Sequence, residues 1–163
     1  MKTKIGFIGG SGVYQVKGME IIDQVELKTP FCSPSAPLTL LEKQRRQFWF
    51  LARHGQHHTL SPSEVNYRAN IFALKKMGVD YLVSLSAVGS LDENLAPTDF
   101  FLPDQFIDWT KGIRPRSFFG EGVVGHVSVA NPVDKTLQKR LFCACETIGV
   151  NASEDGTYLC IEG

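Results

Sequence analysis

The chain has 163 residues, of which 43% are hydrophobic, and it carries 17 basic and 17 acidic side chains. The length suits one compact domain with a substantial core, so we expect residues 1–163 to form a single domain. A formal charge of zero argues against non-specific nucleic-acid binding, which needs basic side chains, and no apolar run reaches the roughly 18 residues of a membrane span.

The first third of the chain contains apolar runs that are typical of strands, separated by Gly, Pro and Ser. We predict strands at 4–10, 25–29, 38–42 and 47–52. The first of them, KIGFIGG, enters a glycine turn.

A helix is predicted after the fourth strand. Ser61 and Glu64 have the spacing of a capping box, with Pro62 at the first helical position, and Gly78 supplies the stop. The following run VDYLVSLSA (79–87) is typical of a strand buried on both faces. A strand, a helix and a buried strand in this order predict a parallel crossover unit.

The second half of the chain continues the alternation of strands and helices. We predict one or two strands in 99–110, an amphipathic helix in 132–149 that ends at Gly149, and a core strand in 157–163. The fold class is therefore α/β.

The four cysteines show no metal-binding or redox spacing. Without a C-x-x-C pair they are interpreted as reduced packing residues of an intracellular protein, which predicts a cytoplasmic location. They are Cys32, Cys143, Cys145 and Cys160.

The glycine turn IGGSG (8–12) has the composition of a phosphate cradle. Its glycines allow a tight turn with inward-facing N–H groups, and the Ser11 hydroxyl adds a donor. It is neither a dinucleotide fingerprint, because Gln15 stands where the third glycine belongs, nor a P-loop. A turn without a ligand remains the alternative.

An arginine and three histidines follow the strand at 47–52. Because ligands gather beyond the carboxyl ends of parallel strands, Arg53 and the hydroxyls of Ser86 and Ser90 predict an anion site. Metal binding is less favoured, since His57 and His58 would point apart in an extended chain and no carboxylate cluster surrounds them. His54 can instead be a hydrogen-bonded polar residue at the strand end.

Several segments together resemble the 5'-methylthioadenosine phosphorylase branch of the purine nucleoside phosphorylase family. The resemblance covers the whole chain in order, and its most specific parts are RHG followed by NYRANI and SAVGSL. The segments are IGFIGGSGVY, TPFCSPSAPL, LARHGQHH, SPSEVNYRANIFALKKMGV, SAVGSLDE, PDQFIDWTKG, FFGEGVVGHVSVANP and GTYLCIEG.

The resemblance implies a nucleoside phosphorylase fold, a mixed sheet with a distorted barrel flanked by helices, assembled as a homotrimer or a dimer of trimers. It implies phosphorolysis of 5'-methylthioadenosine to adenine and 5-methylthioribose 1-phosphate in methionine and purine salvage, with inorganic phosphate as co-substrate and no cofactor or metal. The implied phosphate-binding residues are Ser11, Arg53, His54, Ser86 and Ala87.

The resemblance also places His126 as the residue that a neighbouring subunit lends to the nucleoside. It implies that the chain is the N-terminal portion of the enzyme, with the purine-protonating aspartate beyond residue 163, so that the 163 residues alone are inactive. The alternatives are a 5'-methylthioinosine or general purine nucleoside phosphorylase, an inactive phosphate-binding fragment and a dinucleotide-binding module.

Overall fold

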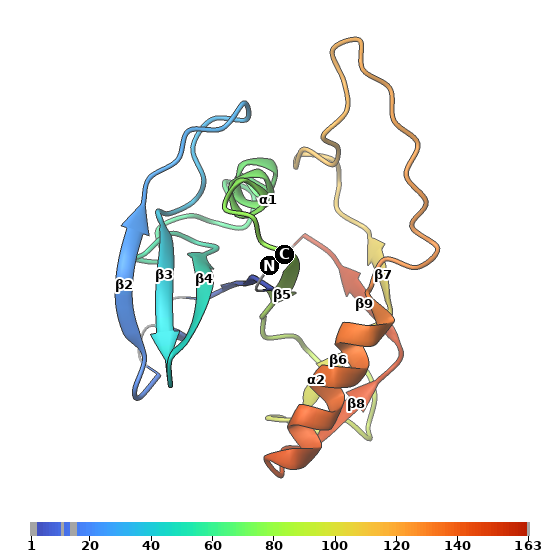
Figure 1. Cartoon of the computed structure of the whole chain (residues 1–163). Helices are drawn as coiled ribbons and strands as arrows, with labels where there is room; N and C mark the ends of the chain where they lie inside the picture. The colour runs from blue at the N-terminus through green and yellow to red at the C-terminus, as the bar shows by residue number, and fades with distance from the viewer. Residues whose placement is uncertain (1–2, 11, 14–15, 163) are drawn as a thin grey trace. The chain divides into compact units, whose positions relative to one another are not determined.

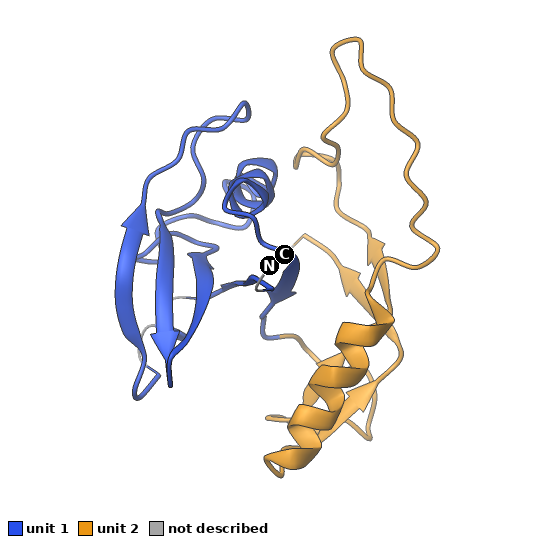
Figure 2. Ribbon diagram, in the orientation of Figure 1, with its two compact units in different colours: residues 1–87 blue, residues 88–163 orange. Residues whose placement is uncertain are grey.

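The computed structural model describes residues 3–10, 12–13 and 16–162 and divides into two compact units, residues 1–87 (unit 1) and 88–163 (unit 2) (Figure 2). Each unit is described by itself. The expectation that residues 1–163 form one domain stays a prediction. No helix in the described ranges is long and apolar enough to cross a bilayer.

Unit 1 is built on a mixed five-stranded sheet in the order β2-β3-β4-β1-β5 (Figure 1). β3 pairs antiparallel with both β2 and β4, whereas β1 pairs parallel with both β4 and β5. The strands are β1 Ile5–Gly9, β2 Glu20–Val25, β3 Leu38–Lys43, β4 Arg46–Ala52 and β5 Tyr81–Ser84. The α/β class, the mixed sheet and the parallel crossover are confirmed.

The apolar run of β4 is buried because alternate side chains enter two different clusters. Trp49 and Leu51 pack with Leu74 of helix α1 (Tyr67–Lys76) on one face of the sheet. Phe50 and Ala52 pack in a second cluster with Leu41 and Ala36. The core of unit 1 therefore lies on both faces of β4.

Two predicted boundaries in unit 1 are wrong. The strand predicted at 25–29 lies earlier, at β2, because Val25 pairs with Leu38, the first residue of β3, and later residues have no β3 partner. The capping box forms a separate turn, in which the Ser61 N–H donates to the Glu64 carboxylate at 2.9 Å. The helix begins only after Asn66, whose side chain accepts from the Ala69 N–H at 3.2 Å.

The strand predicted at 79–87 is shorter and less buried than expected. Among the described residues β5 pairs with β1 alone, at an edge of this sheet, and its side chains range from half-buried to exposed. The predicted burial on both faces is wrong for this strand, because none of its four side chains is buried. The helix stop is confirmed, since Gly78 adopts a φ of +77° directly after α1.

Unit 2 contains helix α2 and two parallel two-stranded sheets. The first sheet pairs β6 (Phe100–Leu102) with β8 (Ala152–Glu154), and the second pairs β7 (Gln105–Asp108) with β9 (Thr157–Cys160). The prediction of two strands in 99–110 is confirmed, β8 was missed, and the side chains of β9 are exposed or half-buried rather than core.

Helix α2 (Lys135–Thr147) forms where the sequence predicts it, with Asp134 as N-cap and Gly149 in the left-handed region after its end. Its buried side chain is Gln138, which donates to the carbonyl of Leu102 at 2.8 Å. The helix is therefore attached to β6 by a polar contact.

The four cysteines are free, as expected. The expected packing role is wrong for Cys32 and Cys143, which are exposed. Cys32 lies in a tight turn closed by the Thr29–Cys32 bridge and has a φ of +70°.

Candidate functional site

Three strand ends of unit 1 meet at one edge of the sheet. In the parallel register Gly9 lies opposite Ala52 and Ile8 opposite Ser84. Backbone bonds extend this alignment, because the Arg53 N–H donates to the Gly9 carbonyl and the Leu85 N–H to the Ile8 carbonyl, both at 2.8 Å. The residues that follow β1, β4 and β5 therefore start from neighbouring points.

The Arg53 guanidinium spans this edge. Arg53 follows β4, and its Nη1 donates to the Leu85 carbonyl, just after β5, at 3.2 Å. Because β1 lies between β4 and β5, the side chain passes the end of β1. At that end a Cβ on Gly9 would lie 3.3 Å from the Leu85 Cβ, so a glycine suits the close approach of the two strand ends.

The His54 ring has two protein partners. Its Nδ1 lies 2.8 Å from the Leu60 carbonyl oxygen, and its Nε2 accepts from Arg53 Nε at 3.2 Å. The His54 ring also lies against the His58 ring, with centroids 4.7 Å apart. The predicted extended chain at His57 and His58 is wrong, since residues 53–58 form turns and His58 has a φ of +54°.

The backbone after two of the strand ends carries donors suited to an anion. The hydrogen bonds found among the described residues use the N–H groups of Arg53 and Leu85 but give no acceptor to those of His54, Ser86 and Ala87. Ser86 and Ala87 are exposed. The edge thus combines a cation with N–H and hydroxyl donors, which is the chemistry of an oxyanion or phosphate site.

Two predicted binding residues remain, Ser11 and His126. Ser11 lies outside the described residues. His126 is exposed in unit 2, within a segment (residues 111–133) that has neither helix nor strand. The structure brings Arg53, His54 and the segment of Ser86 together, and the binding roles of all these residues stay predictions.

Sequence reasoning missed the groups that hold Arg53 and His54 in place. They are the backbone carbonyls of Leu85 and Leu60. No side-chain pattern points to such groups, because any residue type carries a carbonyl. The sequence gives no separate signal for Leu85, which lies inside the strand predicted at 79–87 and directly after the observed β5.

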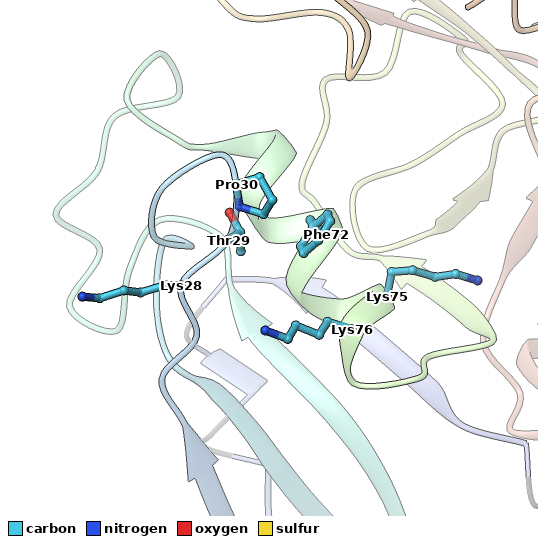
Figure 3. A pocket seen from close by; sticks show the side chains of 6 residues that line it. All are labelled: Lys28, Thr29, Pro30, Phe72, Lys75 and Lys76. Carbon is cyan, nitrogen blue, oxygen red and sulfur yellow. The ribbon is translucent and has the colours of Figure 1, made fainter. Parts of the chain in front are cut away.

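Two surface hollows are lined by residues other than those of this edge. One, of about 460 Å³, is lined by Lys28, Thr29, Pro30, Phe72, Lys75 and Lys76. Figure 3 shows that the amino groups of Lys28 and Lys75 point away from one another, so the lysines do not converge on one anion. The other hollow, in unit 2, is lined by Lys135, Thr136, Lys139, Arg140 and Cys143 of α2.

Two carboxylates of unit 2 are held in the ionised form. The Gly156 N–H and then the Lys135 ammonium lower the pKa of Asp104. The Thr110 hydroxyl and N–H, with smaller help from Arg116, lower the pKa of Asp108. Both groups are poor proton donors near neutral pH. Among the described residues no three His, Cys, Asp or Glu side chains gather as a metal site.

Two curated relatives of the chain are both S-methyl-5'-thioadenosine phosphorylases. The chain is 44% identical over its full length to an S-methyl-5'-thioadenosine phosphorylase of Geobacter sulfurreducens and 47% identical to that of Koribacter versatilis. It covers 57% and 56% of those proteins, and so spans little more than half the length of the curated relatives it matches.

Solved structures agree with these relatives. A crystal structure of a methylthioadenosine phosphorylase from an antarctic soil metagenomic library matches 99% of the chain with a TM-score of 0.92 at 46% identity, and 57% of that structure is covered. The Schistosoma mansoni methylthioadenosine phosphorylase in complex with tubercidin matches 99% of the chain with a TM-score of 0.90 at 32% identity, and 65% of that structure is covered.

The sequence model of the phosphorylase superfamily matches residues 4–163. The expected nucleoside phosphorylase fold is supported by these structural matches. On this match over nearly the whole chain, the chain belongs to the phosphorylase superfamily.

Proposed function

We propose that the chain supplies the phosphate subsite of an S-methyl-5'-thioadenosine phosphorylase. The observation that carries the proposal is the Arg53 guanidinium, which reaches from the end of β4 to the Leu85 carbonyl across the end of β1. The names and 44–47% identity of the relatives support 5'-methylthioadenosine as the nucleoside.

The proposed reaction follows from the charge of the groups. A phosphate oxygen bonds to the anomeric carbon of the nucleoside while the bond from that carbon to N9 breaks, and its electron pair leaves with the purine, which takes a proton. The sugar passes through a cationic state, so a bound phosphate dianion both stabilises that charge and captures it. Positioning of the phosphate and its electrostatic stabilisation of the sugar cation therefore supply most of the catalysis at the phosphate subsite.

The residues have separate proposed roles at the dianion. The Arg53 guanidinium provides the positive charge, and the hydroxyls of Ser11 and Ser86 donate hydrogen bonds. The backbone N–H groups of His54 and Ala87 complete the set. This arrangement needs no metal or organic cofactor, since phosphate is itself the nucleophile.

The proposal extends to the whole protein. We infer a cytoplasmic enzyme of methionine and purine salvage that acts as a homotrimer, with His126 of one subunit facing the nucleoside of its neighbour. The exposed position of His126 is compatible with that role.

The first test is phosphate binding by the 163-residue chain, measured by isothermal titration calorimetry. Arg53→Ala should weaken phosphate binding about tenfold or more, because hydrogen bonds to charged groups contribute about 1.5–3 kcal/mol. Arg46→Ala is the matched control, since Arg46 is an exposed arginine at the opposite end of the same strand. Equal phosphate affinity of wild type and Arg53→Ala would contradict the proposal.

The second test addresses the nucleoside. A chimaera joins residues 1–163 to the part of the Geobacter sulfurreducens relative that the chain does not cover. It should release adenine from 5'-methylthioadenosine in the presence of phosphate, and Arg53→Ala should raise the KM for phosphate more than that for the nucleoside. Adenine release without phosphate dependence would refute the assignment.

A further inference from the structure

The His54 ring is fixed in one protonation form by its two partners. A carbonyl oxygen only accepts, so Nδ1, 2.8 Å from the Leu60 oxygen, must carry the proton. A guanidinium only donates, so Nε2, 3.2 Å from Arg53 Nε, must offer its lone pair. Both requirements are met by the neutral ring with its proton on Nδ1.

The same ring is held on two further sides. The Leu60 N–H donates to the His54 carbonyl at 3.1 Å, so the backbone and ring of His54 both bind Leu60. The His58 ring lies at an angle of 31° to the His54 ring, with centroids 4.7 Å apart. These contacts leave the His54 imidazole little freedom to turn toward another partner.

The Arg53 guanidinium is held at two separate atoms. Nε donates to His54, and Nη1 donates to the Leu85 carbonyl at 3.2 Å. The planar fork is therefore fixed in direction, and the hydrogen bonds found among the described residues give Nη2 no protein partner. Fixing a side chain before binding reduces the entropy that binding must offset.

We propose that the His54 imidazole is a positioning residue that sets the Arg53 guanidinium for a dianion, rather than a ligand of the dianion. The proposal rests on the proposed phosphate subsite. A ring that bound phosphate itself would need an N–H aimed at the anion, and the one N–H of the neutral ring is directed to Leu60. A ring with only a structural role, holding the backbone turn between His54 and Leu60, would need the Leu60 contact and not the Arg53 contact.

Two matched variants separate these roles. His54→Gln places an amide near Nε2 and keeps an acceptor for Arg53, whereas His54→Asn places an amide near Nδ1 and keeps a donor for Leu60. Isothermal titration calorimetry of the 163-residue chain with inorganic phosphate should show His54→Gln within about twofold of wild type and His54→Asn weaker by about threefold to tenfold. Weaker binding by His54→Gln than by His54→Asn, or equal binding by both, would overturn the positioning role.

A second measurement does not depend on phosphate binding. Nitrogen-15 NMR of the histidine rings distinguishes a proton on Nδ1 from one on Nε2, and the spectrum of His54→Gln identifies the His54 signal. We expect the Nδ1–H form, although a free imidazole side chain in water favours Nε2–H. An Nε2–H signal would overturn the positioning role.

The two measurements also separate the two proposals. If wild type binds no phosphate while His54 shows the Nδ1–H form, the phosphate subsite is refuted while the ring form that the Leu60 and Arg53 contacts require stands. If phosphate binds and Arg53→Ala abolishes binding while His54 shows the Nε2–H form, the phosphate subsite stands and the positioning role is refuted.

Discussion

Units 1 and 2 form regular structure in different ways. Among the described residues the buried apolar side chains all lie in unit 1, whereas the buried side chains of unit 2 are those of Thr110 and Gln138. Unit 2 instead exposes large apolar groups, such as Leu91 at 97% and Trp109 at 72%. Hydrogen bonds therefore define strands and a helix in both units, whereas burial of apolar side chains stabilises mainly unit 1.

The charged groups of the two units also differ. Unit 1 carries the Arg53 cation and N–H donors at a strand edge, and the acids Asp104 and Asp108 of unit 2 have lowered pKa values. A leaving purine needs a proton donor, which these carboxylates do not provide near neutral pH.

The largest predicted effect concerns catalysis by the chain alone. Purified residues 1–163 should release adenine from 5'-methylthioadenosine at least about 10²-fold more slowly than the Geobacter sulfurreducens relative, because general acid catalysis contributes about 10²–10⁴-fold. Chromatographic detection of adenine measures this. Adenine release at the rate of the relative would mean that an acid in unit 2, despite its environment, donates the proton.

The second prediction compares burial directly. Leu51→Ala should lower the free energy of unfolding of unit 1 by about 2–5 kcal/mol, because Leu51 is fully buried beside Trp49. Leu159→Ala in β9, where Leu159 is 37% exposed, should cost less than about 1 kcal/mol.

The two tryptophans of the chain provide the measurement. Trp49 is buried in unit 1 and Trp109 is exposed in unit 2, so Trp109→Phe leaves a single reporter in the core of unit 1. Urea unfolding followed by Trp49 fluorescence should show the Leu51→Ala effect. If Leu51→Ala and Leu159→Ala lowered the free energy of unfolding by similar amounts, the inference that apolar burial stabilises mainly unit 1 would be wrong.

The third prediction is a stabilising substitution in unit 1. Cys32 has a side chain at a φ of +70°, a region that costs a residue with a Cβ about 1–2 kcal/mol. Cys32→Gly should therefore raise the free energy of unfolding by about 1 kcal/mol, less the chain entropy that glycine adds to the unfolded state. Cys143→Ala, at an exposed helical position, is the control and should change little.

The smallest predicted effect is a pH dependence of unit 2. Folding lowers the pKa of Asp104, so its carboxylate stabilises the unit above the ordinary aspartate pKa, and this contribution is lost as pH falls through the lowered value, below about pH 4. Exchange of the Gly156 amide, which donates to Asp104, should accelerate there beyond its intrinsic rate. Asp104→Asn should abolish this acceleration, and an unchanged profile would contradict the account.

The sequence predicts most of unit 1 because its signals are local. The apolar runs around Phe7 and Phe50 mark β1 and β4, and the end of β4 directly locates Arg53. The sequence does not predict β8, because its segment Ala152–Glu154 has no apolar pattern and is defined by pairing with β6. Tertiary pairing overrides local preference there.

The finer part of the site is also beyond sequence reasoning. The contact between His54 and Leu60 depends on how the backbone of residues 53–58 turns. His58 in this turn has a positive φ, which its residue type alone does not predict. The edge position of β5 likewise follows from the strand order of the finished sheet. A run of apolar residues predicts a strand but does not predict which strands pair with it.

The strand order of unit 1 has a consequence for its synthesis on the ribosome. β2, β3 and β4 pair with their sequence neighbours, but β1 lies between β4 and β5 and its pairing is complete only when residue 84 has been made. At about 5–20 residues per second, the first strand waits roughly 4–15 seconds after its own synthesis. During that interval the edge of β1 that later pairs with β5 has no strand partner.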